Sequence, residues 1–265
     1  MNKKELAAAL SPDTDPAPFF ALADKVRRER VGDAVHLRGL IEFSNHCRRN
    51  CFYCGIRRGN AGVRRFRLDA ERILDCARTA AALKYGSVVM QSGEDLSWGT
   101  AELAGVVERI KVETGLAVTL SVGERSREDY RALRAAGADR FLLRFETSDR
   151  RLFAMLKPDS DYDERFRCLA WLKEAGFQVG SGVMTGLPGQ TLESMADDIL
   201  IFKELELDMV GIGPFIPSPG TPLAGAPAAT LESALRMVAL TRIVTGNAHM
   251  PATSAMGAID PNGRQ

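Results

Sequence analysis

The sequence has little that would suit it to a membrane, a nucleic acid or an oxidising compartment. Its longest uncharged run, residues 209–231, is interrupted by five prolines, so it cannot form a membrane-spanning helix. A formal net charge of +1 gives no basis for binding nucleic acid or a membrane surface. The five cysteines are few and odd in number, and the N-terminus does not resemble a secretory signal, which argues against a disulfide framework. We therefore expect a cytoplasmic protein in a reducing compartment.

From residue 36 onward, short β-rich runs alternate with longer amphipathic runs, which predicts an α/β fold. The predicted strands are residues 36–43, 87–91, 117–122, 140–146, 178–184, 209–213 and 250–254. The predicted helices between them are residues 69–85, 100–114, 127–136, 163–175, 192–205 and 231–245. Glycines lie where helix ends favour a left-handed residue, at positions 86, 115, 137, 176 and 246.

Strands that recur about every 30–40 residues with helices between them are typical of a parallel (β/α) barrel of the TIM type. A chain of 265 residues can form such a barrel as one domain. We expect residues 1–35 to form a helical prefix and residues 36–265 to form the barrel domain. About seven of the eight strands of a closed barrel are predicted. We therefore expect an incomplete barrel, and we favour a fragment of a longer protein over an open barrel.

Cys47, Cys51 and Cys54 form a C-x3-C-x2-C pattern on one predicted loop. Three thiolates on one loop can ligate three irons of a four-iron cluster and leave the fourth iron open to a substrate or cofactor. With Tyr53 before the last cysteine, the pattern resembles the signature of the radical S-adenosylmethionine (SAM) superfamily. The resemblance implies a [4Fe-4S] cluster whose open iron binds SAM, and reductive cleavage of SAM to a 5′-deoxyadenosyl radical.

Other interpretations of the cysteines are weaker. A structural zinc site could add His46 or His249 to the three thiolates, but zinc loops usually carry a second ligand pair, which this sequence lacks. The two remaining cysteines, Cys76 and Cys168, stand alone in predicted helices. We expect both to be buried core thiols.

Candidate SAM ligands follow several predicted strands, because active sites of α/β barrels lie at the carboxyl ends of the strands. Gly93 permits close backbone approach, and Glu94 lies in a run that resembles the Gly-Gly-Glu element that holds the SAM amino group. We expect Glu146 to accept hydrogen bonds from the ribose hydroxyls and Arg165 to contact the SAM carboxylate. A glycine-rich turn at Gly186 could place backbone against adenine. Ordinary strand-to-helix turns stay open as the alternative for both glycine positions.

Polar residues at positions predicted to face the barrel interior suggest a site for an anionic small molecule. These residues are Arg38, Thr119, Arg144, Thr253 and Ser254. A barrel core is normally filled with Val, Ile and Leu, and buried arginines need a counter-charge or an anionic ligand. A purely structural ion pair between Arg144 and Glu146 is the alternative.

Arginines are concentrated around the cysteine loop, at positions 48, 49, 57, 58, 64, 65 and 67. They form either a solvated basic rim or a docking surface for an acidic electron donor of the flavodoxin or ferredoxin type, which would be attracted by the positive charge.

Longer strings narrow the resemblance to one family within the superfamily. Residues 41–58, 91–95, 186–191, 209–217 and 251–257 resemble the [FeFe]-hydrogenase maturase HydE, of the biotin synthase-like group. The resemblance implies assembly of the diiron subcluster of the hydrogenase H-cluster from an iron–carbonyl–cyanide–cysteine precursor. It also implies a partner maturase and a scaffold GTPase. For the residues, it implies cluster ligation by the three cysteines, SAM contacts from Tyr53, Glu94, Glu146 and Arg165, and the anion site named above.

Departures from that family leave other functions open. Phe145 stands where histidine is expected, which removes one pocket contact, and we expect the family's C-terminal portion to be missing. Another radical SAM enzyme, such as a carbon-skeleton mutase, stays possible. A sulfur-inserting enzyme is disfavoured, because only Cys76 and Cys168 remain to hold a second cluster. The third alternative is an inactive scaffold that binds iron–sulfur or zinc.

Overall fold

The computed structural model describes residues 1–264, which fall into two compact units. The first, here called the cysteine unit, comprises Val35–Leu143 and Lys157–Val179. The second, here called the terminal unit, comprises Met1–Ala34, Arg144–Leu156 and the chain from Gly180 onward. The expected division into a prefix and a barrel domain at residue 35 stays a prediction.

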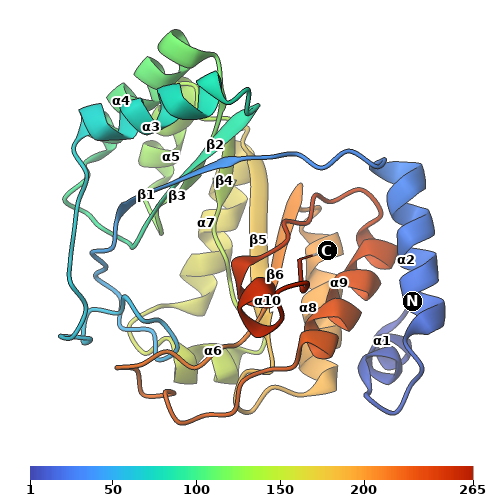
Figure 1. The fold of residues 1–265 in the computed structure, drawn as a ribbon. Helices are drawn as coiled ribbons and strands as arrows, with labels where there is room; N and C mark the ends of the chain where they lie inside the picture. Colours follow the sequence, from blue (N-terminus) through green and yellow to red (C-terminus); the bar gives the residue numbers. More distant parts are fainter. Residues whose placement is uncertain (265) are drawn as a thin grey trace. The chain divides into compact units, whose positions relative to one another are not determined.

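The strands confirm an α/β fold built from parallel β/α repeats (Figure 1). They follow chain order in one sheet: β1 (Gly39–Ser44), β2 (Ser87–Ser92), β3 (Ala117–Ser121), β4 (Arg140–Leu142), β5 (Gln178–Thr185) and β6 (Met209–Pro214). In the described part of the chain β1 and β6 are the two end strands of an open order. This arrangement is compatible with an incomplete barrel.

The helices lie close to their predicted positions, with two additions. They are α1 (Lys3–Leu10), α2 (Ala17–Arg30), α3 (Ala70–Ala82), α4 (Thr100–Thr114), α5 (Arg127–Ala135), α6 (Arg150–Leu156), α7 (Tyr162–Glu174), α8 (Leu192–Glu204), α9 (Leu231–Thr245) and α10 (Ser254–Ile259). The additions are α6 and α10, which are too short to show an amphipathic repeat in the sequence. No helix within residues 1–264 is both long enough and apolar enough to cross a membrane.

Local sequence explains most helix ends. Asp69, Asp161 and Thr230 each accept a hydrogen bond from a backbone N–H in the first turn of the helix that follows. Gly115 ends α4 in the left-handed conformation, with φ of 68°. After α3 the prediction is wrong, because the residue in the left-handed conformation is Lys84 and not Gly86.

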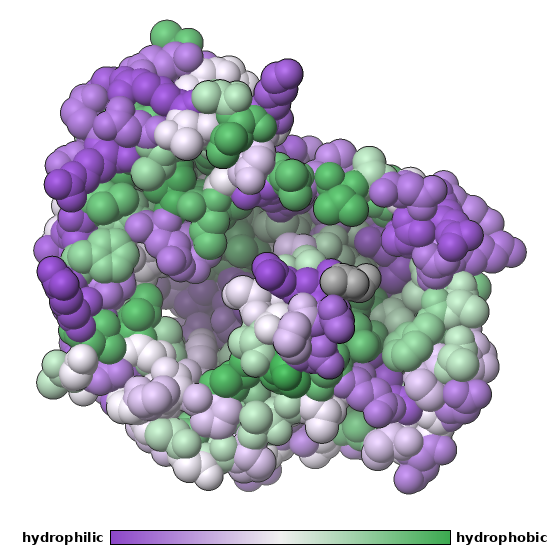
Figure 2. Space-filling model, in the orientation of Figure 1, coloured by the Kyte–Doolittle hydropathy of each residue, from purple (hydrophilic) through white to green (hydrophobic). Residues whose placement is uncertain are grey.

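In the cysteine unit, β1 to β4 pack against helices α3, α4, α5 and α7. Two pairs of aromatic rings lie edge to face. The rings of Phe43 on β1 and Trp98 in the loop before α4 have centroids 5.4 Å apart, and those of Tyr130 on α5 and Phe141 on β4 have centroids 5.2 Å apart. Figure 2 shows many hydrophilic side chains over the outer helices α3 and α4. The polar outer face and the aromatic inner face fix which side of each helix meets the sheet.

In the terminal unit, α1 packs on α8 and α2 packs on α9 (Figure 1). Arg236 of α9 is buried and donates to the carbonyl of Ala9, which ties α1 to α9. Phe145 is fully buried, with its ring centroid 5.6 Å from that of Phe202 on α8. The core of this unit therefore lies between α8 and the strand segments.

The predicted seventh strand, residues 250–254, is wrong. Pairing with β6 is limited to an isolated bridge between Met209 and His249. Pro251 has no backbone N–H to continue a ladder, and the chain begins α10 at Ser254. The expectation that Cys76 is buried is also wrong, because the buried face of α3 is formed by residues 73, 74, 77 and 80 and leaves Cys76 exposed. Cys168 is buried, as predicted.

One acid lies in the core of the terminal unit. Asp198, on α8, has no exposed surface, and its Oδ1 accepts a 2.6 Å hydrogen bond from the backbone N–H of Ser148. Its Oδ2 has no hydrogen-bond partner within residues 1–264. Burial raises the pKa of Asp198 to about 7, although the hydrogen bonds from Ser148 act in the opposite direction.

We expect Asp198→Asn to stabilise the protein more at pH 8 than at pH 5. The carboxyl ionises near its ordinary pKa of 3.8 in the unfolded chain but only near pH 7 in the folded one, so the wild type loses stability as the pH rises between these values. Asn does not titrate. The difference in unfolding free energy between variant and wild type should therefore grow by roughly 2–3 kcal/mol from pH 5 to pH 8.

Urea unfolding of the metal-free protein at the two pH values measures this difference. Asp197→Asn is the matched control, because Asp197 is the next residue on α8 and pairs with Lys3 at the surface. The control should show the same difference at both pH values. A difference that is also constant for Asp198→Asn would contradict the burial argument.

Candidate functional site

The cysteine loop follows β1 and is shaped by its own hydrogen bonds. The guanidinium of Arg65 donates to the carbonyls of Asn45, Ile56 and Arg57, at 2.5, 2.8 and 2.7 Å. The backbone N–H of Asn45 donates to the carbonyl of Phe66. The loop that carries the three cysteines is thus closed on itself by side-chain bonds to backbone.

The end of β2 packs directly on this loop. A Cβ at Gly93 would lie 2.2 Å from the carbonyl oxygen of His46 and 2.8 Å from the Cβ of Cys47, so only glycine fits there. The backbone N–H of Glu94 donates to the sulfur of Cys47 at 3.3 Å, and its carbonyl accepts from the N–H of Arg48 at 3.0 Å. The predicted Gly93–Glu94 segment and the cysteine loop are therefore one local structure.

The cysteines suit an iron–sulfur cluster. All three are free and half-buried, and the N–H···S bond at Cys47 is of the kind that tunes cluster sulfurs. Burial raises the pKa of the Cys51 thiol, and the nearby charge of Lys157 and a hydrogen bond to Tyr53 partly offset that rise. Within residues 1–264, no three His, Cys, Asp or Glu side chains converge on one ion. Cluster cysteines need not converge, because each binds a different iron.

Glu94 is a buried carboxylate held by two arginines. Its side chain is 4% exposed, and Oε1 accepts from Nε of Arg48 at 2.5 Å and from Nε of Arg49 at 2.9 Å. Its Oε2 accepts from the backbone N–H of Glu124 at 3.2 Å. Gly123 is left-handed, with φ of 79°, and a Cβ there would lie 2.4 Å from Cγ of Glu94. The loop after β3 is thus built around this carboxylate.

The charge network continues to Arg165. Arg49 also pairs with Glu124 and donates to the carbonyl of Asp159. Glu124 in turn lies 2.8 Å from Nε of Arg165, and all of these side chains are largely buried. Alternating charges let each ion leave water at a tolerable cost. The predicted SAM ligands Glu94 and Arg165 are therefore linked through two residues, Arg49 and Glu124.

Sequence reasoning missed Glu124 and Asp159. Neither belongs to a spaced motif, and the partners of Arg49 lie 75 and 110 positions away in the chain. One signal was present for Glu124, because it follows the third strand by a few residues, at the strand end where a barrel site was expected.

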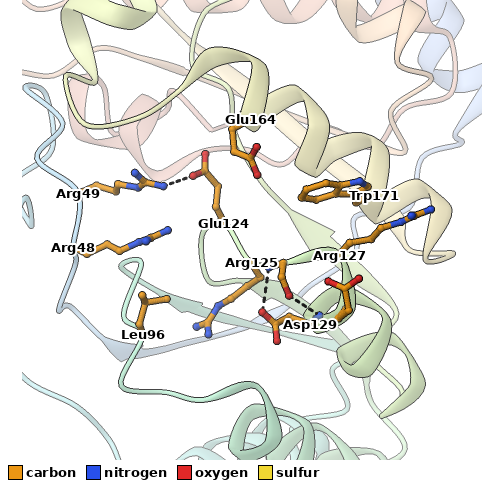
Figure 3. A pocket seen from close by; sticks show the side chains of 11 residues that line it. Arg48, Arg49, Leu96, Glu124, Arg125, Arg127, Asp129, Glu164 and Trp171 are labelled. Atoms are coloured by element: carbon orange, nitrogen blue, oxygen red, sulfur yellow. Dashed lines mark hydrogen bonds and ion pairs between the residues drawn. The ribbon is translucent and has the colours of Figure 1, made fainter.

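A cavity of about 510 Å³ opens beside this network, between the loop after β3 and helices α5 and α7 (Figure 3). Arginines and acids alternate along its wall, and Figure 3 shows Arg49 pointing at Glu124 across one end. Trp171 of α7 and Leu96 add apolar surface. The cysteine loop contributes Arg48 and Arg49 to its wall, whereas the three cysteines themselves are not among the lining residues.

Asp95, next to Glu94, holds the residues on either side of the cysteine loop. It accepts from Oγ of Ser44 at 2.6 Å and from Nε of Arg67 at 2.6 Å. Burial raises the pKa of Asp95, but the bonds from Arg67 and Ser44 outweigh it and hold the pKa at about 2. The carboxylate is ionised under all physiological conditions and fastens the end of β1 to the end of β2.

The arginine cluster therefore has two parts. Arg48, Arg49, Arg65 and Arg67 carry the structural bonds described above. Of the others, Arg57 lies 5.7 Å from the ring centroid of Phe52, while Arg58 is 64% exposed and Arg64 is also exposed. Arg58 also lies 3.8 Å from Oδ2 of Asp159.

In the terminal unit, Arg144 and Glu146 share one face of the chain after β4. Residues alternate between buried and half-buried from 140 to 147, as the sequence predicts. Nη2 of Arg144 lies 3.0 Å from Oε2 of Glu146 and donates to the carbonyl of Val183. Phe145 points to the opposite face and packs on Phe202. The contact expected to be lost with histidine is therefore not on the Arg144–Glu146 face.

The other predicted site residues have varied surroundings. Arg38 precedes β1 instead of lying on it, and burial together with the charge of Arg140 lowers its pKa. Thr119 is fully buried on β3, and its hydroxyl has no hydrogen-bond partner within residues 1–264. Both belong to the cysteine unit.

Three more predicted residues lie in the terminal unit. Thr253 precedes α10 and donates to the carbonyl of Ile212 at 3.1 Å, while Ser254 is exposed at the first position of that helix. Neither is on a strand, contrary to prediction. Gly186 is left-handed, and a Cβ there would lie 2.4 Å from that of Ala229, so local packing alone requires glycine.

Comparison with known proteins shows the family to which the chain belongs. The family model described as the radical SAM superfamily matches residues 41–202, and the chain belongs to that superfamily. The [FeFe] hydrogenase maturase subunit HydE of Thermotoga maritima is 50% identical over 93% of this chain and 71% of its own length. Within the superfamily, the chain belongs to the HydE family. It is a radical SAM enzyme, and its cofactors are a [4Fe-4S] cluster and SAM.

More distant relatives share the fold. The 3-methylornithine synthase of Methanosarcina acetivorans is 27% identical over 98% of this chain and 75% of its own length. A crystal structure of methylornithine synthase superposes with a TM-score of 0.89 at 27% identity, covering 95% of this chain and 75% of that one.

We expect Gly93→Ala to lose most of its cluster. The added Cβ would overlap the carbonyl of His46, and because that atom is backbone, the cysteine loop would have to move. Iron and sulfide content after anaerobic reconstitution, with the visible absorption band, measures the loss. Gly105→Ala, on α4 with open space around the new Cβ, is the control and should load fully. Full loading of Gly93→Ala would show that the close packing is not needed for cluster binding.

Proposed function

We propose that this radical SAM enzyme cleaves SAM reductively to a 5′-deoxyadenosyl radical and acts in assembly of the diiron subcluster of the [FeFe]-hydrogenase H-cluster. The observation that carries the proposal is the 50% identity to HydE over 93% of the chain. The buried charge network beside the cysteine loop supports it, because the network contains a carboxylate, Glu94, and a guanidinium, Arg165, which are the groups that bind an ammonium and a carboxylate.

In this proposal Cys47, Cys51 and Cys54 hold the cluster, which supplies the electron for SAM cleavage. Glu94 receives the SAM ammonium and Arg165 its carboxylate. Of the two arginines on Glu94, Arg48 is 45% exposed and Arg49 is 17% exposed. Arg48 is the partner that can leave for solvent when the ammonium arrives, whereas Arg49 stays fixed by Glu124 and Asp159.

The remaining SAM contacts are assigned by the family pattern. Tyr53 lies beside Cys51 at the cluster. Glu146 is the acceptor for the ribose hydroxyls, and Gly186 is the turn against adenine. The Glu146 carboxylate already pairs with Arg144, at 3.0 Å between Oε2 and Nη2.

The substrate is proposed to be a small anionic metal complex, the iron–carbonyl–cyanide–cysteine precursor. Its site is assigned to Arg38, Thr119, Arg144, Thr253 and Ser254. Support comes from Arg38, which lies near enough to Arg140 for the two charges to disfavour each other. The buried hydroxyl of Thr119 adds a donor. An anion there would relieve the repulsion.

We propose an electron-donor protein from the exposed arginines near the cysteine loop, and two further protein partners from the resemblance to the HydE family. An acidic flavodoxin or ferredoxin would dock on Arg57, Arg58 and Arg64 near the cluster loop. A partner maturase would supply the precursor and a scaffold GTPase would receive the product.

The function is tested in two assays of the reconstituted protein under anaerobic conditions. The first measures 5′-deoxyadenosine by chromatography after dithionite reduction, with EPR of the reduced cluster recorded with and without SAM. The second measures hydrogen evolution after apo-hydrogenase is incubated with this protein and the other maturases. We expect 5′-deoxyadenosine, a SAM-dependent EPR change and hydrogenase activation.

Cys51→Ala should abolish all three signals, and Cys76→Ala, at the exposed cysteine of α3, should abolish none. SAM cleavage without hydrogenase activation would overturn the maturase role. It would favour a carbon-skeleton reaction, consistent with the likeness to methylornithine synthase. A cluster that neither senses nor cleaves SAM would support the inactive scaffold.

We expect Arg165→Lys to weaken SAM binding about tenfold, because lysine keeps the charge but loses the planar fork that matches a carboxylate. Calorimetry with the oxidised cluster-loaded protein measures the dissociation constant. Arg167→Lys, two residues along α7 and paired at the surface with Glu164, is the control and should bind SAM like the wild type. Equal affinities for the two variants would remove Arg165 from the SAM site.

A further inference from the structure

We propose that Asp198 is a positioning residue that holds Glu146 in the conformation needed to bind the ribose of SAM. The inference rests on the proposed role of Glu146. Asp198 lies on α8, in no sequence motif, and within residues 1–264 its hydrogen bonds are with Ser148, two residues after Glu146. Asp198 touches no ligand in this proposal. It acts through the backbone.

Glu146 has an unusual backbone. Its φ is 70°, in the left-handed region that residues with a side chain seldom adopt. Such a conformation persists only where the surroundings fix the chain on both sides. At Glu146 the chain is fixed by β5. The N–H of Glu146 donates to the carbonyl of Gly182 at 2.9 Å, and the carbonyl of Glu146 accepts from the N–H of Met184 at 3.1 Å.

After Glu146 the chain leaves the strand and has no ladder to hold it. Thr147 is fully buried, and Asp149 accepts from the N–H groups of Arg151 and Leu152 to begin α6. Between them, the Ser148 N–H donates to Asp198 at 2.6 Å. This bond is the anchor between the strand and α6, so it determines how the chain departs from Glu146.

The free energy lost by burying Asp198 argues for a role in positioning Glu146. The side chain is fully buried, among neighbours on α8 such as Met195, Ile199 and Phe202 that are apolar. A buried acid with an unsatisfied oxygen destabilises the fold relative to an apolar residue of similar size. The hydrogen bond that Asp198 makes is the one to the Ser148 N–H, in the segment after Glu146. Without it, we expect φ of Glu146 to relax and its carboxylate to leave the face it shares with Arg144.

The test is the discrimination between SAM and an analogue that lacks one ribose hydroxyl. Dissociation constants for SAM, 2′-deoxy-SAM and 3′-deoxy-SAM are measured by calorimetry with the cluster oxidised, so that no turnover occurs. The variants are Asp198→Ala, Asp198→Leu, Asp198→Asn and Glu146→Gln. Asp197→Ala, at the neighbouring surface position, is the control.

We expect Asp198→Ala and Asp198→Leu to weaken SAM binding about fivefold and to leave binding of at least one deoxy analogue nearly unchanged, so that discrimination falls. Glu146→Gln should lower the same discrimination. Asp198→Asn should keep it, because its amide oxygen can accept the Ser148 bond. Leucine fills the space of the acid, so a folded variant without the acceptor is available even if the alanine variant is unstable.

Unchanged discrimination in the Asp198→Leu variant, with a loss in Glu146→Gln, would overturn the positioning role and leave the ribose role of Glu146 intact. Unchanged discrimination in Glu146→Gln would remove Glu146 from the ribose site and the inference with it. Neither result would affect the cleavage and maturation assays, which depend on Cys51.

Discussion

The buried carboxylate of Glu94 is the constraint on which the cysteine unit depends. A lone carboxylate in that position would cost several kcal/mol, so the fold surrounds it with counter-charges and N–H donors. Arg48 and Arg49 come from the cysteine loop, and the Glu124 N–H comes from the loop after β3. The ends of three strands are thereby brought to one point, and the loop that carries the thiolates is fixed by the same bonds that hold the acid.

The sequence was informative where the signal was local. Periodicity gave both bounds of α4 and α9, and spacing alone singled out the three cysteines. It failed at residues 250–254, where β-rich composition suggested a strand but Pro251 interrupts the ladder, and at Cys76, which lies one step off the apolar face of α3. Glu124 and Asp198 were missed for another reason. Their partners are 30 to 75 residues away, and only the folded chain brings such positions together.

The fold of this protein is shared with radical SAM enzymes that have other names, so the fold does not determine the reaction. The likeness to methylornithine synthase is high in fold and modest in sequence, so the scaffold alone does not select a reaction. Selection must come from side chains that contact the substrate. Of the residues proposed for that role, Arg38 precedes β1 and Thr253 precedes α10, whereas Thr119 is buried on β3. Positions outside the strands can change without disturbing the sheet.

The hydrogen bonds from Arg65 to three carbonyls of the cysteine loop have a consequence for metal loading. Because Asn45 precedes the three cysteines and Ile56 and Arg57 follow them, one side chain holds the two ends of the loop together. Less conformational entropy is then left for cluster binding to remove from the segment that carries the thiols.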